Sequence, residues 1–232
     1  MLDTPVPPRS YPDMTETLRF PDVMLLTAGN GMALRAIAGL PLVERIMANA
    51  KAEGAKRFVA NGQPGDHGVL AHFGGLVKVS REEVPMGSGG GVRQALPMLH
   101  ADPFFVMESN AFWPAASDTP LQRMLARYAS TEDIVLLCVH PREAVGFARS
   151  HDFCLSPQGM ITHDYGAPVI YGGVALLGKS LFTGTPHGAF SLDLLIDAAL
   201  ERETLHGVVL DAPWFQVKDA ASLAAAETRL AP

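Results

Sequence analysis

DVMLLTAGNG, at residues 22–31, is the stretch of this sequence that decides its fold class. Its first six residues are almost continuously apolar, which is typical of a strand that is buried on both faces, as in a parallel sheet. Gly29 and Gly31 then mark a turn at the carboxyl end of that strand. We therefore expect the ordered part of the chain to open with a core strand of an α/β sheet.

The segments that follow alternate between helical and strand-like patterns. Apolar residues recur at helical spacing over 41–53, 92–99, 121–128, 192–202 and 220–230, and short apolar runs at 57–60, 76–79, 103–107, 134–139, 208–210 and 214–217 are typical of strands. The turn-rich segments 153–156, 159–162 and 168–177 indicate a hairpin or mixed-sheet insertion. This order predicts a doubly wound, mostly parallel (mixed) sheet flanked by helices, with a Rossmann-like arrangement and a ligand site beyond the carboxyl ends of the strands.

Composition limits the classes of partner. The chain has 24 acidic and 18 basic residues and a formal charge of −6, without a block of Lys or Arg that could follow a nucleic-acid backbone. Its apolar runs are far shorter than the roughly 20 residues that cross a bilayer. We expect a loosely ordered arm at 1–20 without the features of a signal peptide, one domain at 21–232, a cytoplasmic location, and Cys138 and Cys154 as buried thiols.

The first candidate motif is the turn after the opening strand. Gly29 and Gly31 carry no side chains, so backbone N–H groups could approach a phosphate or a base closely. A third glycine at the spacing of the dinucleotide-binding fingerprint is missing, and an ordinary strand-to-helix turn is the alternative. Arg35 could supply positive charge to a triphosphate, or it could be a surface arginine.

The second candidate motif is the run PMGSGGGV at 85–92, in which three successive glycines lead into the helix expected at 92–99. A helix N-terminus offers free N–H donors and a positive dipole, and the missing side chains leave room for a base or a ribose. A flexible hinge is the alternative. Because successive glycines are conformationally costly, we favour a requirement for close approach.

The third candidate motif is FFVMESNAFW at 104–113, an apolar run that ends in Glu108 and Asn110. The carboxyl end of a core strand is where an α/β enzyme places a carboxylate that binds a metal ion. Glu108 could ligate Mg²⁺, whereas the neutral Asn110 is a much weaker ligand. A polar strand end that faces solvent is the alternative.

Taken in order, these motifs resemble the sugar-1-phosphate nucleotidyltransferases, in particular the N-acetylmuramic acid 1-phosphate uridylyltransferase branch found in bacterial cell-wall recycling. The resemblance spans nearly all of residues 22–230 and is carried by LLTAGNG, AGLPLVERI, GSGGGVRQALPML, DPFFVMESNAFW, PVIYGGVALL, FSLDLLIDAAL and WFQVKDAASLAAAE. It implies the nucleotidyltransferase fold and transfer of a nucleotidyl group from a nucleoside triphosphate such as UTP to a sugar 1-phosphate, with release of pyrophosphate. It also implies that Mg²⁺ neutralises the phosphate charge.

The resemblance also assigns roles to positions of this chain. By position, the nucleotide would contact the first loop, the base and ribose would contact the second glycine run, and the sugar would lie beside the end of the third motif. The residues concerned are Ala28, Gly29, Asn30 and Gly31 for the nucleotide, Gly89 and Gly90 for the base and ribose, and Glu108, Tyr171, Gly172 and Gly173 for the sugar.

The chain departs from the family at its catalytic positions. The basic continuation of the family's first loop is shortened to residues 32–38, where Arg35 is the sole cation. Asn110 stands where the family has its main Mg²⁺-binding aspartate, and Gln216 replaces the second ligand. Lys218 replaces a glycine.

These substitutions open an alternative function. The chain could be a pseudoenzyme that binds a nucleotide or a nucleotide sugar without turnover, as a sensor or a partner subunit. A structural partner whose cleft no longer binds nucleotides is a third hypothesis. Glu108, Asp66 or Asp219 could instead restore metal binding if one of them faced the cleft.

Overall fold

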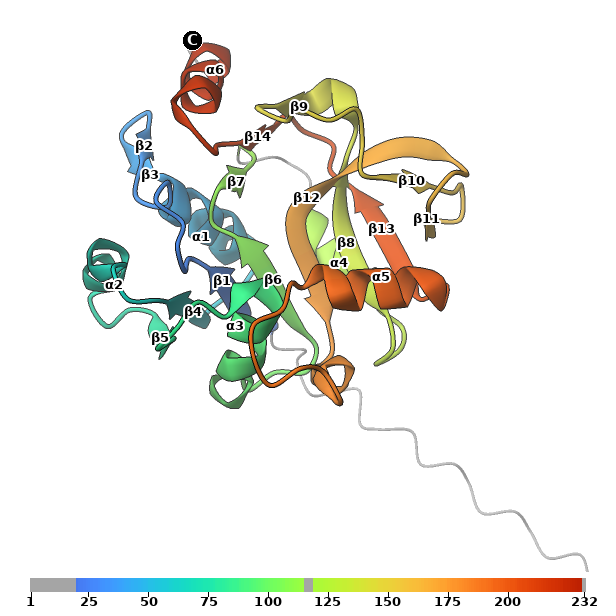
Figure 1. The fold of residues 1–232 in the computed structure, drawn as a ribbon. Coiled ribbons are helices and arrows are strands. Elements are labelled where there is room, and N and C mark those ends of the chain that lie inside the picture. Colours follow the sequence, from blue (N-terminus) through green and yellow to red (C-terminus); the bar gives the residue numbers. More distant parts are fainter. Residues whose placement is uncertain (1–19, 115–118, 231–232) are drawn as a thin grey trace, which may run out of the picture.

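The computed structural model describes residues 20–114 and 119–230, so the arm expected at 1–20 lies outside the described residues except for Phe20. A nine-stranded mixed sheet forms the centre of the molecule (Figure 1). Its strands are β1 (Val23–Leu26), β4 (Phe58–Gly62), β5 (Lys78–Arg81), β6 (Phe104–Glu108), β8 (Ile134–Val139), β10 (Phe153–Leu155), β11 (Ile161–Thr162), β12 (Ala167–Leu177) and β13 (Leu205–Val209).

Seven of the nine strands of this sheet run in one direction, and four of its eight strand pairs are parallel. β1 lies between β6 and β4 and is parallel to both, β4 is parallel to β5, and β8 is parallel to β13. β12 runs antiparallel between β6 and β8, and its first residues pair with β10. The sheet is therefore mixed and mostly parallel, as predicted, and the turn-rich segment after Pro141 supplies a central strand as well as a hairpin.

Helices cover both faces of the sheet. They are α1 (Leu42–Ala52), α2 (His67–Phe73), α3 (Gly87–Ala95), α4 (Pro120–Arg127), α5 (Asp193–Glu201) and α6 (Ala220–Leu230). The apolar side chains of α1 and α4, such as Ile46 and Leu121, pack on one face, and those of α3 and α5, such as Val92 and Ile196, pack on the other (Figure 1). Each amphipathic helix thus buries its apolar stripe against the sheet.

Two helical segments differ from the prediction. α3 begins at Gly87 rather than at Val92, so the glycine run forms the first turns of the helix instead of a loop before it. α2 was not predicted, because its seven residues bury only Val69 and Phe73 and so show too little periodicity. β5 also starts later than predicted, and Leu76 is 87% exposed in the turn before it.

Two small sheets complete the fold. β7 (Ala111–Phe112) and β9 (Ala144–Val145) pair with β14 (Trp214–Gln216) on either side, and β2 (Ala36–Ile37) pairs with β3 (Leu40–Pro41). In the first of these sheets Gln216 lies opposite Ala111, and the Val217 N–H donates to the Asn110 carbonyl at 2.8 Å. The pairing therefore brings Asn110 and Gln216, which are far apart in the sequence, to one place.

The two cysteines and the lengths of the helices agree with the expectations from the sequence. Cys138 and Cys154 are buried and free, as predicted. In the described part of the chain, no helix has both the length and the apolar character that a membrane crossing requires.

Candidate functional site

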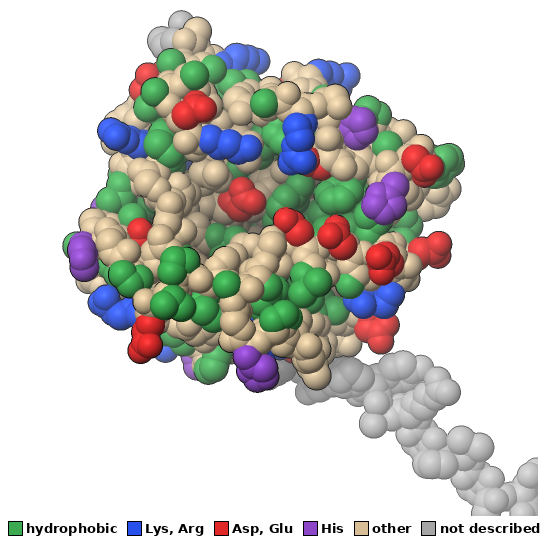
Figure 2. Space-filling view, viewed as in Figure 1, with side chains coloured by type: hydrophobic (Ala, Val, Ile, Leu, Met, Phe, Trp, Pro, Cys, Tyr) green, Lys and Arg blue, Asp and Glu red, His purple; other side chains and the backbone are tan. Residues whose placement is uncertain are grey.

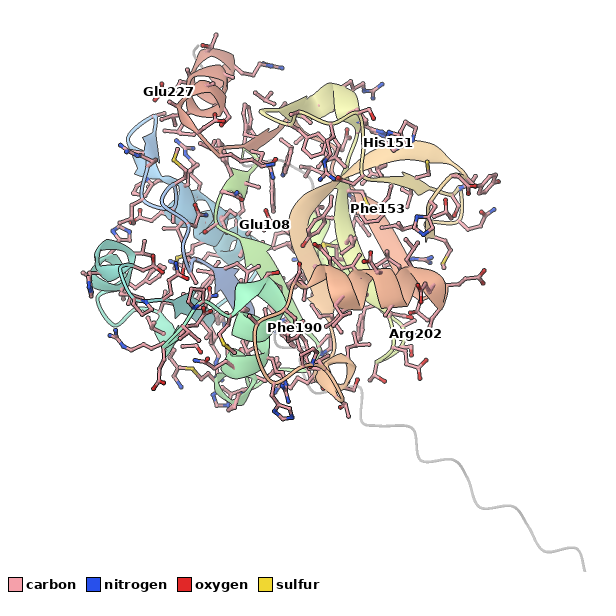
Figure 3. All side chains as sticks on the ribbon, in the orientation of Figure 1. Glu108, His151, Phe153, Phe190, Arg202 and Glu227 are labelled. Carbon is pink, nitrogen blue, oxygen red and sulfur yellow. The ribbon has the colours of Figure 1, made fainter. Side chains whose placement is uncertain are left out.

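The candidate site lies at the carboxyl ends of β1 and β6, where β12 and β14 approach them. Figure 2 shows a hollow near the centre of this face with an acidic side chain inside it, and Figure 3 labels Glu108 at that place in the same orientation. We call this hollow the cleft. A separate depression of about 350 Å³ lies between α1 and α2 and contains none of the site residues predicted from the sequence.

The first glycine loop is held by side chains from β4 and the turn after it. The N–H groups of Thr27 and Ala28 donate to Asn61 Oδ1 at 2.8 and 3.2 Å. The Gly29 N–H donates to Asp66 Oδ2 at 3.0 Å, and the same carboxylate oxygen accepts the Gln63 N–H at 2.9 Å. A phosphate that used the Gly29 N–H would have to displace Asp66, which carries the same sign of charge.

Asn30 ties the same loop to the end of β6. Its Nδ2 donates to Ser109 Oγ at 2.7 Å, and that hydroxyl donates to the Leu26 carbonyl at 2.6 Å. Asn30 Oδ1 accepts the Met32 N–H at 3.0 Å. The loop is therefore a closed turn whose polar groups bond largely within the chain. The predicted contacts of Ala28, Gly29, Asn30 and Gly31 with a nucleotide remain a prediction.

Arg35 lies where this loop enters the β2–β3 hairpin. Its N–H donates to the Met32 carbonyl at 2.8 Å, and its own carbonyl accepts the Leu42 N–H at 3.0 Å. Its side chain is exposed and forms no ion pair or hydrogen bond with the residues that the structure describes. The hairpin joins the loop directly to α1, so Arg35 is the only cation that this connection can offer to a ligand.

The second glycine run packs against the segment before α5. The N–H groups of Gly89 and Gly90 both donate to the Phe190 carbonyl, at 2.9 and 3.2 Å. A Cβ atom at Gly89 would lie 2.4 Å from the Phe190 ring, and one at Gly91 would lie 2.5 Å from Glu82 Oε1. Close approach explains these glycines, as expected, but the partner that approaches is the chain itself. The predicted role of Gly89 and Gly90 in binding a base and a ribose is a separate, untested prediction.

Asn110 and Gln216 form the pair of amides at the strand ends. Gln216 is only 8% exposed. Asn110 Oδ1 and Gln216 Oε1 are both buried, and neither forms a hydrogen bond with the residues described here. A buried polar atom without a partner costs free energy, so such atoms often mark a place where something binds.

The three carboxylates that could replace the missing metal ligands lie in different environments. Asp66 accepts bonds in the first loop, as described above. Asp219 Oδ1 accepts the Ser222 N–H at 2.8 Å and the Ser222 hydroxyl at 2.7 Å at the start of α6. These bonds lower the pKa of Asp219. Glu108 is therefore the candidate among the three that lies in the cleft (Figure 3).

Glu108 is partly buried beside β12. A Cβ atom on Gly173 would lie 3.3 Å from Glu108 Cβ, so the glycine permits this close contact. Burial raises the pKa of Glu108; the nearby positive charge of Lys218 opposes this shift, and the negative charges of Asp193 and Asp152 add to it. The carboxyl group thus resists ionisation more than an exposed glutamate does.

Tyr171 and Gly172 complete the wall formed by β12. The Tyr171 N–H donates to Asp152 Oδ2 at 3.0 Å, and Trp214 Nε1 donates to the Gly172 carbonyl at 3.0 Å. Burial, together with the charge of Glu108, raises the pKa of Tyr171 well above its usual value, which keeps the phenol neutral. The structure therefore brings the predicted sugar-binding residues together, while their role stays a prediction.

The donor atoms in the cleft do not fit the Mg²⁺ that the resemblance implies. Mg²⁺ prefers carboxylate and water oxygens in octahedral geometry. Among the described residues, the cleft offers two neutral amides and the Glu108 carboxyl group, which resists ionisation. Asp152, whose charge acts on Glu108, is already paired with Arg149 at 2.6 Å. In residues 20–114 and 119–230, no group of three or more His, Cys, Asp or Glu side chains is arranged to hold a metal ion.

Several residues that shape the site were not predicted. Asn61 and Glu82 form a buried hydrogen bond of 2.7 Å beside Gly91, and Asn61 also holds the first loop. A polar residue directly after the buried run at 57–60 is a signal that could have identified Asn61. Gln63, Asp152 and Asp193 carry no comparable signal, because turns and helix starts are commonly polar.

Glu108 gives a prediction about pH. Because the folded state raises its pKa, the folded protein binds more protons than the unfolded chain at pH values between the unfolded pKa of about 4.3 and the raised pKa of the folded state. The free energy of unfolding therefore falls as the pH rises through that window. Glu108→Gln should raise the free energy of unfolding at neutral pH and flatten its pH dependence, as measured by urea unfolding at several pH values. Glu201→Gln, at an exposed position, is the control; equal slopes in both variants would contradict the prediction.

The chain is similar in sequence and in fold to known proteins. N-acetylmuramate alpha-1-phosphate uridylyltransferase of Caulobacter vibrioides is 28% identical over 219 residues, which cover 89% of this chain and 90% of that protein. The structure of HddC from Yersinia pseudotuberculosis, complexed with GMP-PN, matches at a TM-score of 0.72 with 17% identity, covering 91% of this chain and all of the other. UTP-bound UGPase from Acinetobacter baumannii matches at a TM-score of 0.67 with 16% identity, covering 90% and 93%.

These comparisons decide the relationship and the fold. No family model matches the chain. At identities below 20%, the two solved structures show a common fold and nothing finer. The chain therefore resembles the sugar-1-phosphate nucleotidyltransferases, the uridylyltransferase of N-acetylmuramate α-1-phosphate in particular, over nearly its whole length, and it has the nucleotidyltransferase fold.

Proposed function

We propose that the cleft binds a nucleotide or a nucleotide sugar and that the protein does not transfer a nucleotidyl group. The observation that carries this proposal is the pair of buried amide oxygens, Asn110 Oδ1 and Gln216 Oε1, which have no partner among the described residues and lie at the ends of β6 and β14. The relative from Caulobacter vibrioides is named for uridylyl transfer, and the solved structures are described with GMP-PN and with UTP. These names support a nucleotide as the ligand.

The expected loss of activity follows from the charges of the reaction. Nucleotidyl transfer builds negative charge on the phosphates, and a transferase neutralises it with metal ions and cationic side chains. Losing one such contact typically costs about 3–4 kcal/mol in the transition state. Two amides in place of carboxylates, together with a first loop that offers only Arg35, would therefore lower the rate by several orders of magnitude.

A second candidate function is slow transfer that uses Glu108. This carboxyl group lies in the cleft, and a bound cation would favour its ionised form. In this alternative a nucleoside triphosphate and a sugar 1-phosphate are substrates, and Glu108 is an essential ligand. Glu108→Gln would then abolish the activity.

Calorimetry combined with an assay for pyrophosphate separates these functions. The wild-type protein is titrated with UTP, CTP, GTP, ATP and UDP-N-acetylmuramic acid, in EDTA and then in Mg²⁺, and pyrophosphate is measured with a sugar 1-phosphate present. Binding without pyrophosphate supports the proposal. Mg²⁺-dependent pyrophosphate release supports the transferase, and the absence of binding by every compound contradicts both.

A further inference from the structure

A cation–aromatic cluster lies beside the unpartnered amides. The ring of Phe147 has Lys218 Nζ at 5.9 Å from its centroid and Arg149 Cζ at 5.4 Å. The same ring packs edge-on against Trp214 at 6.3 Å. We call Phe147, Arg149 and Lys218 the Phe147 cluster. It places two positive charges around a fixed aromatic ring.

The backbone fixes this cluster next to Gln216. Lys218 follows Gln216 by two residues, and its N–H donates to Ser222 Oγ at 2.9 Å. Gly146, directly before Phe147, approaches so closely that a Cβ atom there would lie 2.1 Å from the Gln216 carbonyl oxygen. The cluster and the amide therefore belong to one rigid neighbourhood around β9 and β14.

The charges on the two rims of the cleft differ. Figure 2 shows Lys and Arg side chains above the hollow and Asp and Glu side chains along α5. Lys218 is the positive charge that acts most strongly on Glu108, so its influence reaches into the cleft. Arg149 is already paired with Asp152 at 2.6 Å, whereas Lys218 forms no ion pair within bonding distance among the described residues. Of the two cations in the Phe147 cluster, Lys218 is the one left for a ligand.

The amides and the lysine point to one mode of binding. Two carboxylates would repel a phosphate unless a metal ion stood between them. Neutral amides remove that repulsion. Their N–H groups can donate to phosphate oxygens, and their unpartnered oxygens, Asn110 Oδ1 and Gln216 Oε1, can accept from ribose hydroxyls. An ammonium group nearby supplies a compact positive charge that binds phosphate as a point charge.

We propose that Lys218 binds the phosphates of the nucleotide or nucleotide sugar directly, so that binding needs no divalent cation. This inference rests on the proposed function and specifies how the same cleft holds its ligand. The resemblance implies that Mg²⁺ neutralises the phosphates, but the donor atoms of the cleft do not fit Mg²⁺. In this proposal the ammonium group of Lys218 takes that role.

The test compares a charge-removing variant with a matched control. Lys218→Gln removes the charge and keeps a polar, unbranched side chain, and Lys218→Arg keeps the charge. Lys56→Gln removes an exposed charge outside the cleft. The ligand is the compound that binds the wild type in the calorimetry described under Proposed function. The affinity of the wild type for this compound should be the same in EDTA and in Mg²⁺. Lys218→Gln should weaken binding about tenfold or more, because a charge-assisted hydrogen bond is lost. Lys218→Arg should retain most of the affinity, and Lys56→Gln should bind as the wild type does.

The outcomes separate this inference from the proposed function. Binding that requires Mg²⁺, or a Lys218→Gln variant that binds as tightly as the wild type, overturns the inference and leaves the proposed function standing. A wild-type protein that binds no compound of the panel overturns both. Circular dichroism of each variant verifies that a weaker signal does not reflect loss of the fold.

Discussion

Replacing Asn110 and Gln216 together with aspartate should lower the free energy of unfolding in EDTA by about 2–4 kcal/mol. Their buried amide oxygens, which have no hydrogen-bond partner among the described residues, become carboxylate oxygens. Because each shift of one pKa unit corresponds to about 1.4 kcal/mol, two carboxylates that resist ionisation account for a loss of this size. Mg²⁺ should restore much of the stability, because it binds the folded form alone; at a concentration of 100 times its Kd the gain is about 2.7 kcal/mol.

Urea unfolding in EDTA and in Mg²⁺ measures both effects. The stability of the wild type should not change when Mg²⁺ replaces EDTA. Gln158→Glu is the control for a new carboxylate at an exposed turn, distant in sequence from the site, and its stability should not respond to Mg²⁺ either. A double variant that is as stable as the wild type in EDTA would mean that the two side chains face solvent. A double variant that ignores Mg²⁺ would mean that these positions do not face a common ligand.

Gly91→Ala should destabilise the protein by about 2–3 kcal/mol, although alanine is the better helix former. A Cβ atom there would lie 2.5 Å from Glu82 Oε1 and 2.7 Å from Asn61 Nδ2. It would separate a buried hydrogen bond of 2.7 Å and leave Glu82 Oε1 without its partner. The gain of about 1 kcal/mol in helix propensity is smaller than this loss.

Gly31→Ala is the matched control for that variant. A Cβ atom at Gly31 would meet no atom within 4 Å, so the stability of this variant should stay within about 0.5 kcal/mol of the wild type. Thermal and urea unfolding measure both variants. If Gly91→Ala were as stable as Gly31→Ala, the second glycine run would not be explained by close packing within the chain.

The central elements of the fold were predictable because their sequence signals are strong. The run at 134–139 is buried at every position and forms β8 with the predicted bounds, and the amphipathic period at 220–230 forms α6 as predicted. The position of β12 was not predictable, because a strand's partners depend on contacts between distant segments. Its Val169 and Ile170 are buried, yet nothing in that apolar run specifies pairing with β6 and β8.

The candidate site was predictable only where its residues follow a strand with a strong sequence signal. Glu108 follows a buried strand, so its place at the carboxyl edge of the sheet could be expected. Gln216 reaches Asn110 through the pairing of β14 with the two-residue strand β7, which is too short to give a periodic signal. The contact of Phe147 with Lys218 depends on β9, which is equally short. Short strands thus decide the chemistry of the cleft, and sequence patterns do not reveal them.

The release of pyrophosphate by the wild-type protein tests the central claim most directly. The protein is incubated with N-acetylmuramic acid 1-phosphate, Mg²⁺ and each of UTP, CTP, GTP and ATP, and the pyrophosphate formed is compared with a sample without protein. The account predicts no release above that background, because two neutral amides occupy the strand ends where charge would have to be neutralised. Mg²⁺-dependent release above that background would contradict it, and loss of that release in Glu108→Gln would assign the activity to the Glu108 carboxyl group.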